Sequence, residues 1–357
     1  MKRAFYSIVG LLFAVSLPLT SCSSSTTPLQ TSSTVISEAT APESESSETF
    51  DPTRIDFMHF FQTSAESQLL NYTITDQGCF ALFHTLHEET PNFYVLLHLG
   101  TDGKERQRIN ITYLLPDEMS AHEQLSIHAS STGQLYLLAR NSTEASFVIQ
   151  LLNFQGMPTG SFITYAPQND ESGEADDYLT HHLDGHNYMY ATGYTNIDKR
   201  RANFFDVFDP EGQFLFRCFD NFSKAAESER WKFLDLFFSD DDATYVAAHF
   251  PEGHVLLPID LEKQELGEPL PFQRNLLAMQ YRGGEMYYPN ANGLYLFTLD
   301  GQMKEEILRW NRLKINFSFA DAVITVVSSD ILFISEEISS EDGTPEWTSY
   351  YFVTRKG

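Results

Sequence analysis

The chain has 357 residues, of which 49 are acidic and 23 are basic, so its formal net charge is −26 at pH 7. Such an excess of negative charge argues against a surface for nucleic acid or for anionic lipid headgroups, because both require a positive patch. Aromatic residues make up 14% of the chain, and there are 19 glycines and 15 prolines, a composition that favours strands and tight turns over helices.

The first 22 residues have the organisation of a lipoprotein signal peptide. Lys2-Arg3 is a short basic start, and Ala4–Leu19 is uncharged, apolar and too short for a stable membrane span. The sequence Leu19-Thr20-Ser21-Cys22 then resembles the lipobox of bacterial lipoproteins. The resemblance implies removal of residues 1–21, a lipid on Cys22 and an extracytoplasmic position on a bacterial cell membrane, without indicating which membrane. The alternative is an ordinary secretory signal with a chance cysteine.

Residues 22–50 are predicted to form a disordered tether behind the lipidated cysteine. Of the 27 residues in 23–49, 15 are serine or threonine and none is aromatic. Such a segment buries too little apolar surface to offset its chain entropy. We expect it to hold the remaining domain, residues 51–357, clear of the lipid surface.

The remaining domain carries a repeat. In five places Gly or Asp is followed three positions later by an aromatic residue and an apolar run. The five aromatic residues are Tyr136, Tyr188, Tyr245, Tyr287 and Phe333. A sixth, less regular unit begins at Gly78, and successive units are about 50 residues apart. A period of this length with several short strands per unit predicts an all-β propeller of six four-stranded blades, with five or seven blades as alternatives.

Turn sequences divide each unit into strands. Asp102-Gly103 and Asp300-Gly301 each separate two apolar runs, which is a strong sign of a hairpin. The four strands expected in one blade, from the inside outward, are 178–183, 187–193, 203–208 and 213–219.

Only three strands are expected in the sequence of the last blade. Its three expected strands lie at about 317–327, 331–335 and 348–354. A strand around 54–61, which precedes the first blade, is the expected replacement. Closure of the ring by both ends of the domain would remove an exposed sheet edge, which is a liability in any open sheet.

At this level the repeats resemble the six-bladed propellers of the TolB-like and NHL-like group, which includes many bacterial envelope lipoproteins. The resemblance implies an assembly scaffold, a binder of peptidoglycan or sugars, or a lactonase or lyase with a metal in the central channel. Fold alone does not choose among these.

Catalytic motifs give little guidance. The sequence has no G-x-S-x-G, H-E-x-x-H, C-x-x-C, P-loop or G-x-G-x-x-G motif. A metal site in the channel is the sharpest enzymatic hypothesis, with His128, His182 and Asp235 on inner strands as its ligands. Because His181 and His182 are adjacent on a strand, only one of them is expected to face the channel. The alternative is a row of polar residues that line a wet tunnel.

Other polar groups have simpler interpretations. The acidic runs at Asp170–Asp177 and Asp240–Asp242 lack the spacing of an EF-hand, so solvated loops are favoured over calcium sites. Cys79 and Cys218 fall in blades that are not neighbours, so we expect two free thiols. No cofactor and a monomeric chain are expected.

Lys199-Arg200-Arg201 is the only run of three basic residues. It is expected on the loop between the second and third strands of the third blade. A positive spot on an acidic protein is suited to an acidic partner or a glycan carboxylate, although a solubilising loop tip is the simpler interpretation. The sequence thus predicts a lipid-anchored binding or scaffolding propeller for an envelope protein or glycan. The alternative is a metal-dependent lactonase, lyase or hydrolase.

Overall fold

The computed structural model describes residues 49–61, 66–87, 90–115, 124–141, 146–168, 177–197, 200–221, 231–240, 242–272, 276–339 and 345–356. The predicted signal peptide, Cys22 and the tether before residue 49 lie outside these residues. Ser47–Gly357 form one compact unit. No helix in the described ranges is long and apolar enough to cross a membrane.

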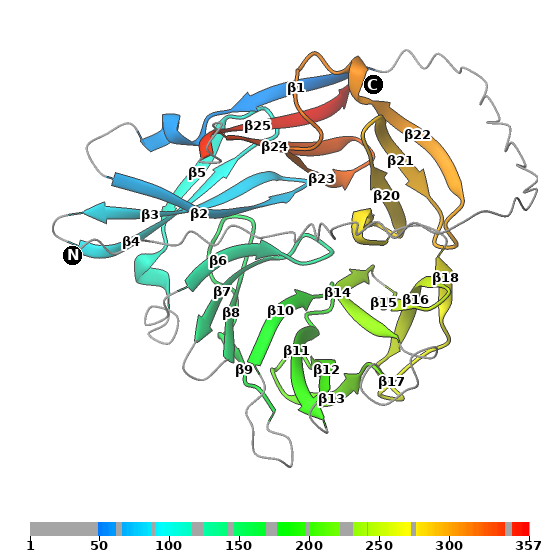
Figure 1. Ribbon diagram of the computed structural model, residues 1–357. Helices are drawn as coiled ribbons and strands as arrows, with labels where there is room; N and C mark the ends of the chain where they lie inside the picture. The colour runs from blue at the N-terminus through cyan, green and yellow to red at the C-terminus, as the bar shows by residue number, and fades with distance from the viewer. Residues whose placement is uncertain are drawn as a thin grey trace, which may run out of the picture. The chain divides into compact units, whose positions relative to one another are not determined.

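Six antiparallel sheets make up this unit (Figure 1). The first blade consists of β2 (Glu66–Thr75), β3 (Gly78–His87), β4 (Thr90–Leu99) and β5 (Glu105–Asn110). The second consists of β6 (Gln124–Ala129), β7 (Leu135–Asn141), β8 (Ser146–Leu152) and β9 (Ile163–Tyr165). The third consists of β10 (Asp177–Leu183), β11 (Met189–Ile197), β12 (Arg200–Phe208) and β13 (Phe214–Phe219).

The remaining three blades follow in chain order. The fourth consists of β14 (Lys232–Ser239), β15 (Thr244–Phe250), β16 (Gly253–Asp260), β17 (Glu265–Leu266) and β18 (Leu270–Phe272). The fifth consists of β19 (Gln280–Arg282), β20 (Glu285–Pro289), β21 (Gly293–Phe297) and β22 (Met303–Arg309). The sixth consists of β23 (Ala322–Ser328), β24 (Ile331–Ser339), β25 (Pro345–Lys356) and β1 (Thr49–Ile55). Short 3₁₀ helices at Phe57–Phe61, Thr112–Leu114, Leu276–Ala278 and Trp310–Arg312 connect strands.

The six-bladed arrangement confirms the prediction, and the third blade has the predicted order from β10 to β13. The turn predicted at Asp102-Gly103 is also present. Gly103 lies between β4 and β5 with a φ of +72°, a conformation that glycine adopts without strain. The Asp102 carboxylate accepts a hydrogen bond from the Lys104 backbone N–H at 3.2 Å, which stabilises the turn.

Side chains of β3 alternate between two blade interfaces. Ala81 and Phe83 pack toward the sixth blade. Phe80 and Leu82 point the other way, toward the second blade. Because successive side chains of a strand lie on opposite faces, one strand supplies both interfaces. This two-sided burial explains why the strand is apolar at nearly every position.

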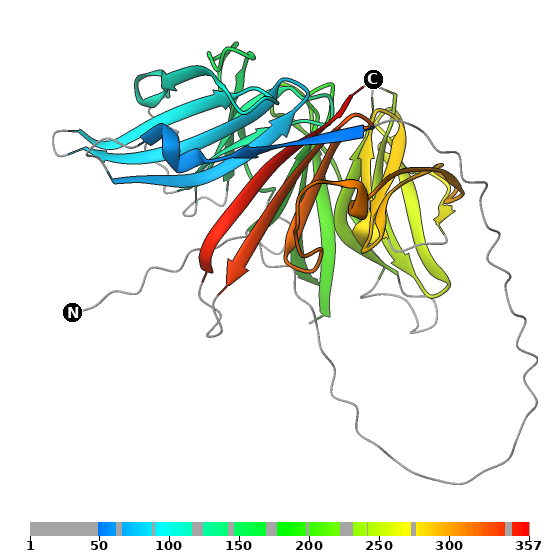
Figure 2. The ribbon, with the colours of Figure 1, turned by 90° about the horizontal axis from the view of Figure 1, so that it is seen from above.

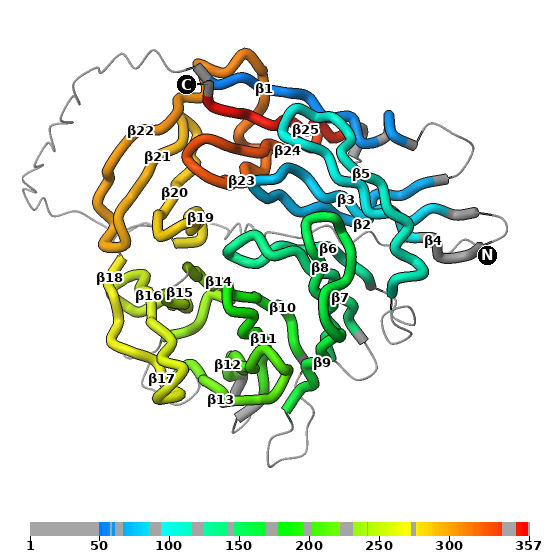
Figure 3. Tube along the Cα trace, turned by 180° about the vertical axis from the view of Figure 1, so that it is seen from behind, coloured from blue at the N-terminus to red at the C-terminus, as the bar shows by residue number. Residues whose placement is uncertain are grey.

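Six hydrophobic clusters lie between neighbouring blades, one at each junction. Aromatic pairs are common in them: Phe147 stacks on Tyr178 between the second and third blades, with ring centroids 6.0 Å apart. Each sheet therefore packs against two others, and the blades close into a ring (Figures 1 and 3). Aromatic residues thus pack neighbouring blades against each other.

The N-terminal strand completes the last blade, as predicted. β1 pairs antiparallel with β25 from Thr49 opposite Lys356 to Ile55 opposite Tyr350. Figure 2 shows the first and last strands of the propeller side by side, with β1 in blue and β25 in red.

The predicted position of this strand, 54–61, was wrong by several residues. Asp56 ends the strand, because its carboxylate and its carbonyl both accept a hydrogen bond from the His59 N–H, each at 3.2 Å. The chain then enters the 3₁₀ helix Phe57–Phe61, and the Phe57 ring packs against Tyr350 with centroids 4.6 Å apart. A local cap and a buried ring thus decide where pairing ends.

Both described cysteines are free, as expected. Cys79 is fully buried at the junction of the first and sixth blades. Cys218 lies on β13 of the third blade and is half-buried. Burial raises the pKa of both thiols, that of Cys218 to about 12, so neither is activated as a nucleophile.

Candidate binding site at the centre of the ring

A pocket of about 280 Å³ lies where the innermost strands end. Its walls come from the ends of β2, β6, β19 and β23 and from the turns that follow β2 and β6, so four of the six blades contribute. We call it the central pocket. The 13 residues that line it are Tyr72, Thr73, Ile74, Thr75, Asp76, Ala129, Ser130, Ser131, Thr132, Gly133, Arg282, Thr325 and Val327.

Two amide side chains hold the inner strands together beside this pocket. Asn71 donates from Nδ2 to the Ile127 carbonyl at 2.8 Å and accepts from the Ile127 N–H at 3.0 Å. Gln280 does the same between blades five and six: it donates to the Ile324 carbonyl at 2.5 Å and accepts from the Val326 N–H at 2.8 Å. Each amide replaces the ladder bonds that neighbouring inner strands of two blades do not make, and so gives the pocket rigid walls.

Arg282 brings the positive charge to the pocket. It is the last residue of β19, directly before Gly283 and Gly284, which have φ of +56° and +77°. The side chain is half-buried, and Nη1 donates to the Tyr281 carbonyl at 2.9 Å. In the described part of the chain no carboxylate forms a salt bridge with Arg282. Burial lowers the pKa of its guanidinium, which nevertheless stays cationic at neutral pH.

The acidic residue that lies opposite Arg282 in the sheet makes its contacts with other side chains. Glu285 pairs with Arg282 across the β19–β20 hairpin. Its carboxylate, however, accepts hydrogen bonds from the Tyr287 hydroxyl at 2.9 Å and from Lys304 Nζ at 3.2 Å. The arrangement therefore leaves the guanidinium of Arg282 available to a ligand.

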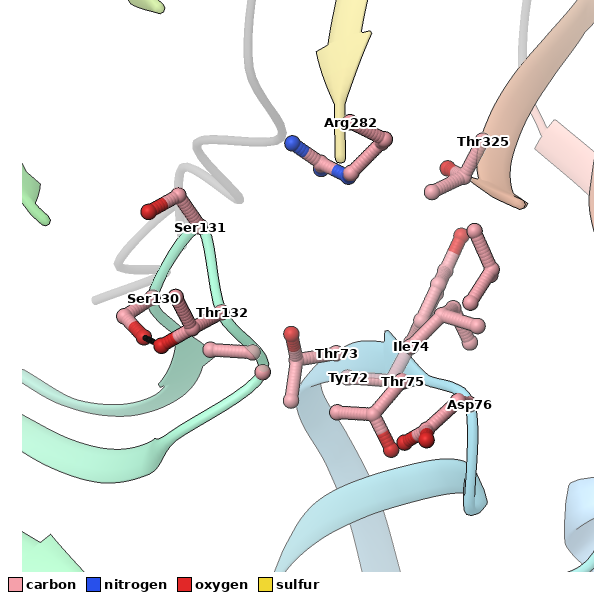
Figure 4. A pocket seen from close by; sticks show the side chains of 13 residues that line it. Tyr72, Thr73, Ile74, Thr75, Asp76, Ser130, Ser131, Thr132, Arg282 and Thr325 are labelled. Carbon is pink, nitrogen blue, oxygen red and sulfur yellow. Dashed lines mark hydrogen bonds between the residues drawn. The ribbon is translucent and has the colours of Figure 1, made fainter. Parts of the chain in front are cut away.

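Hydroxyl groups surround the rest of the pocket (Figure 4). Six of the 13 lining residues are serine or threonine. The Ser130 and Thr132 hydroxyls bond each other at 3.1 Å within the turn after β6. Ser131 Oγ is buried and has no hydrogen-bond partner among the described residues. Asp76, which is exposed, is the only acidic residue of the lining.

The aromatic member of the lining is part of the wall. The Tyr72 ring packs among Phe57, Phe333 and Tyr350, with centroid distances of 5.9, 5.4 and 5.6 Å. Burial raises the pKa of its hydroxyl to about 12. Tyr72 thus joins the first and sixth blades and leaves the polar face of β2, with Thr73 and Thr75, toward the pocket.

The structure separates the three predicted metal ligands. His128 lies on β6 against His181 of β10, with ring centroids 4.8 Å apart, and not against His182. Its Nε2 is 2.8 Å from Ser126 Oγ, and burial lowers its pKa to about 4. The adjacent histidines His181 and His182 do face opposite sides of their strand. Among the described residues, no group of three or more His, Cys, Asp and Glu is arranged to hold a metal ion.

His182 belongs to a chain of hydrogen bonds between the third and fourth blades. Its Nε2 is 2.7 Å from Ser239 Oγ, which is 2.9 Å from Thr244 Oγ1. Thr244 in turn lies 3.5 Å from the carboxylate of Asp184. Ser239 is only 3% exposed. The Asp184 carboxylate contacts the Thr244 hydroxyl and not the His182 imidazole. The arrangement joins two blades and does not present a nucleophile.

Asp235 lies where β14 departs from regular pairing. The register of β14 with β15 shifts between Phe233 and Phe237, and Asp235 has a φ of +52°. Its side chain is exposed. The bulge changes the alternation on which the predicted channel-facing position depended.

The basic run lies at the other end of its blade. β11 ends at Ile197, and β12 begins at Arg200 opposite it, whereas the turn toward the pocket end follows Leu183 of β10. Lys199 lies outside the described residues, as do residues 170–176 and 241 of the two acidic runs. Arg200 and Arg201 are the first two residues of β12, next to the loop on which the run was predicted.

A second hollow, of about 440 Å³, lies on the fifth blade. It is formed by Ala291, Asn292, Tyr295, Arg309, Trp310 and Asn311. Its cation is already paired, because Arg309 Nε donates to the Glu306 carboxylate at 2.6 Å. The two hollows therefore differ in the state of their arginine: Arg309 is paired with a carboxylate, whereas Arg282 has no carboxylate partner among the described residues.

Solved structures align with this chain at low identity and low TM-score. A protein of unknown function from Dyadobacter fermentans aligns with a TM-score of 0.42 and 8% identity, over 86% of this chain and 98% of that chain. The Pan2 WD40 domain of Neurospora crassa aligns with a TM-score of 0.35 and 8% identity, over 85% and 95% of the two chains. No family model matches the sequence, and no curated protein matches it.

Sequence reasoning missed the residues that shape the central pocket. Asn71 and Ser131 belong to the first and second blades, Gln280 and Arg282 both belong to the fifth, and the four share no local motif. One sign was present: Arg282 directly precedes Gly283-Gly284, a pair typical of a tight hairpin turn, and a charge at the end of an inner strand lies near the ring centre. The spacing of the repeats places the strands but does not identify which charge stays unpaired.

Proposed function

We propose that this chain is a lipid-anchored propeller of the bacterial cell envelope that binds a protein or glycan partner at the central pocket. The lipobox-like sequence at Cys22 supports the anchor, and the low-complexity segment behind it supports a tether. The propeller fold is compatible with a binding or scaffolding role. The TolB-like or NHL-like grouping belongs to the same proposal.

The observation that carries the binding role is the state of Arg282. A cation withdrawn from water costs free energy unless it is paired, and here the described residues offer it only a backbone carbonyl. Such a group at a concave, hydroxyl-rich site is suited to a ligand that supplies the missing negative charge.

The test is co-purification of the full lipoprotein from gently solubilised envelopes. We expect a stoichiometric partner or glycan with the wild type and its loss with Arg282→Met. A wild-type protein recovered without any partner would contradict the binding role. The matched variant replaces Lys199, Arg200 and Arg201 with alanine. Loss of the partner from this variant alone would move the contact from the pocket to residues 199–201.

The same preparation tests the anchor and the enzymatic alternative. Cys22→Ala is expected to release the protein from membranes, and its retention there would refute the lipid anchor. Binding is expected to withstand chelators. A stoichiometric divalent ion, together with activity lost on mutation of His128, His182 or Asp235, would instead favour the metal-dependent enzyme.

A further inference from the structure

The central pocket contains two hydrogen-bond donors, each without a side-chain partner among the described residues, that one kind of ligand could engage together. Arg282 presents a guanidinium that no described carboxylate pairs, and Ser131 presents a buried hydroxyl that no described group bonds. The two come from blades five and two, and both line the same pocket. Figure 4 shows the Arg282 side chain extending toward the side of the pocket that carries Ser131.

The charge around the pocket favours a monoanion. A single guanidinium supplies one positive charge, while the chain as a whole carries −26 and Asp76 lies in the lining. A dianion would meet more repulsion than one cation offsets. A planar carboxylate also matches the two parallel N–H groups of a guanidinium, which makes it the best fit among small anions.

The remaining lining identifies what the carboxylate is attached to. The hydroxyls of Thr73, Thr75 and Thr325 add to those of the turn Ser130–Thr132, and the one aromatic ring is held in the wall. These hydroxyl groups donate and accept hydrogen bonds, as do those of a sugar, and they outnumber the apolar side chains Ile74, Ala129 and Val327 in the lining. The volume of about 280 Å³ lies at the low end of ligand pockets, which run from roughly 300 to 1,000 Å³. That is room for one ring rather than a long chain.

We infer that the central pocket binds the uronate unit of an acidic glycan, with its carboxylate on Arg282 and Ser131 and its ring hydroxyls on the surrounding threonines. This inference rests on the proposed binding function and names the ligand of the same site. The Ser131 hydroxyl donates to the carboxylate, which satisfies a group that is otherwise buried without a partner.

The test is isothermal titration calorimetry on the full chain with sodium glucuronate, glucose, acetate and inorganic phosphate. We expect glucuronate to bind at least ten-fold more tightly than the other three. Glucose lacks the carboxylate, acetate lacks the ring, and phosphate lacks both. Equal binding of glucose, acetate or phosphate would overturn the inference, and so would the failure of glucuronate to bind.

Substitutions locate the site. Arg282→Met is expected to weaken glucuronate binding by about ten- to a hundred-fold, and Ser131→Ala by about three- to ten-fold, as for charged and neutral hydrogen bonds. The matched control is Arg309→Met in the hollow of the fifth blade, which is expected to leave affinity unchanged. Unchanged affinity in either pocket variant would overturn the inference, and circular dichroism checks that each variant folds. If Arg282→Met does not fold, Ser131→Ala and the four-ligand comparison still decide the matter.

The outcome is separable from that of the proposed function. An envelope partner that co-purifies with wild-type protein, together with no glucuronate binding, would refute the uronate and leave the binding role. A lack of any partner would refute the binding role itself.

Discussion

Arg217 in the third blade and Arg282 at the central pocket are both withdrawn from solvent, but their surroundings differ. Arg217 donates to both oxygens of Asp206, at 2.5 and 2.7 Å, and lies 4.0 Å from the centre of the Phe204 ring. Asp206, which is completely buried, also accepts a hydrogen bond from Tyr178. Among the described residues, Arg282 donates a hydrogen bond only to the Tyr281 carbonyl. The difference separates a charge that serves the fold from one that is available to a ligand.

The largest expected effect comes from breaking the paired site. Arg217→Met leaves the carboxylate of Asp206 buried without its cation, and the free energy of unfolding is expected to fall by about 3–5 kcal/mol. Urea denaturation of the full chain measures it. The control is Arg309→Met, because the Arg309–Glu306 pair lies at the surface and is expected to contribute at most about 1 kcal/mol. Equal losses in the two variants would remove the distinction between buried and exposed pairs.

A second effect concerns histidines that the fold keeps neutral. Burial lowers the pKa of His128 from 6.5 to about 4 and that of His182 to about 3, and it lowers the pKa of His181 as well. The unfolded chain therefore binds more protons below pH 6.5. Stability is fully present above that pH and is lost as the pH falls from 6.5 toward the folded pKa values.

At pH 5, His128 alone is expected to cost about 2 kcal/mol relative to pH 7.5, since one pKa unit corresponds to about 1.36 kcal/mol. Urea midpoints at the two pH values measure this loss. His128→Gln is expected to reduce the pH dependence by that amount. An unchanged slope would show that His128 is not held neutral by the fold.

The smallest expected effect is on the stability of the unpaired site. Arg282→Met removes a cation that the fold does not pair, so the free energy of unfolding is expected to stay within about 1 kcal/mol of wild type or to rise. The same urea experiment measures it. A loss as large as that for Arg217→Met would mean that Arg282 stabilises the fold, and the contrast between the two sites would disappear.

The sequence predicts much of the architecture because the evidence for it is local. The aromatic residue three positions after Gly or Asp, the Asp102-Gly103 turn and the blade period each depend on neighbouring residues. The end of the N-terminal strand was misplaced because Asp56 terminates the strand earlier than hydropathy indicates. Asp235 lies on an inner strand, as predicted, but strand alternation does not reveal the bulge in which it lies.

The central pocket is different in kind. Its lining combines residues 72–76, 129–133, 282, 325 and 327, which only the closed ring brings together. Whether Arg282 is paired depends on Glu285, which Lys304 and Tyr287 engage instead. No spacing in the sequence encodes that choice, since it depends on three side chains of one folded sheet.

The most direct test is a crystal structure of the full chain with glucuronate bound. We predict the carboxylate within hydrogen-bond distance of the Arg282 guanidinium and of Ser131 Oγ, with the sugar ring among the threonine hydroxyls of the central pocket. A ligand at another place, or an Arg282 paired with a carboxylate of the protein itself, would contradict the assignment of this pocket as the binding site.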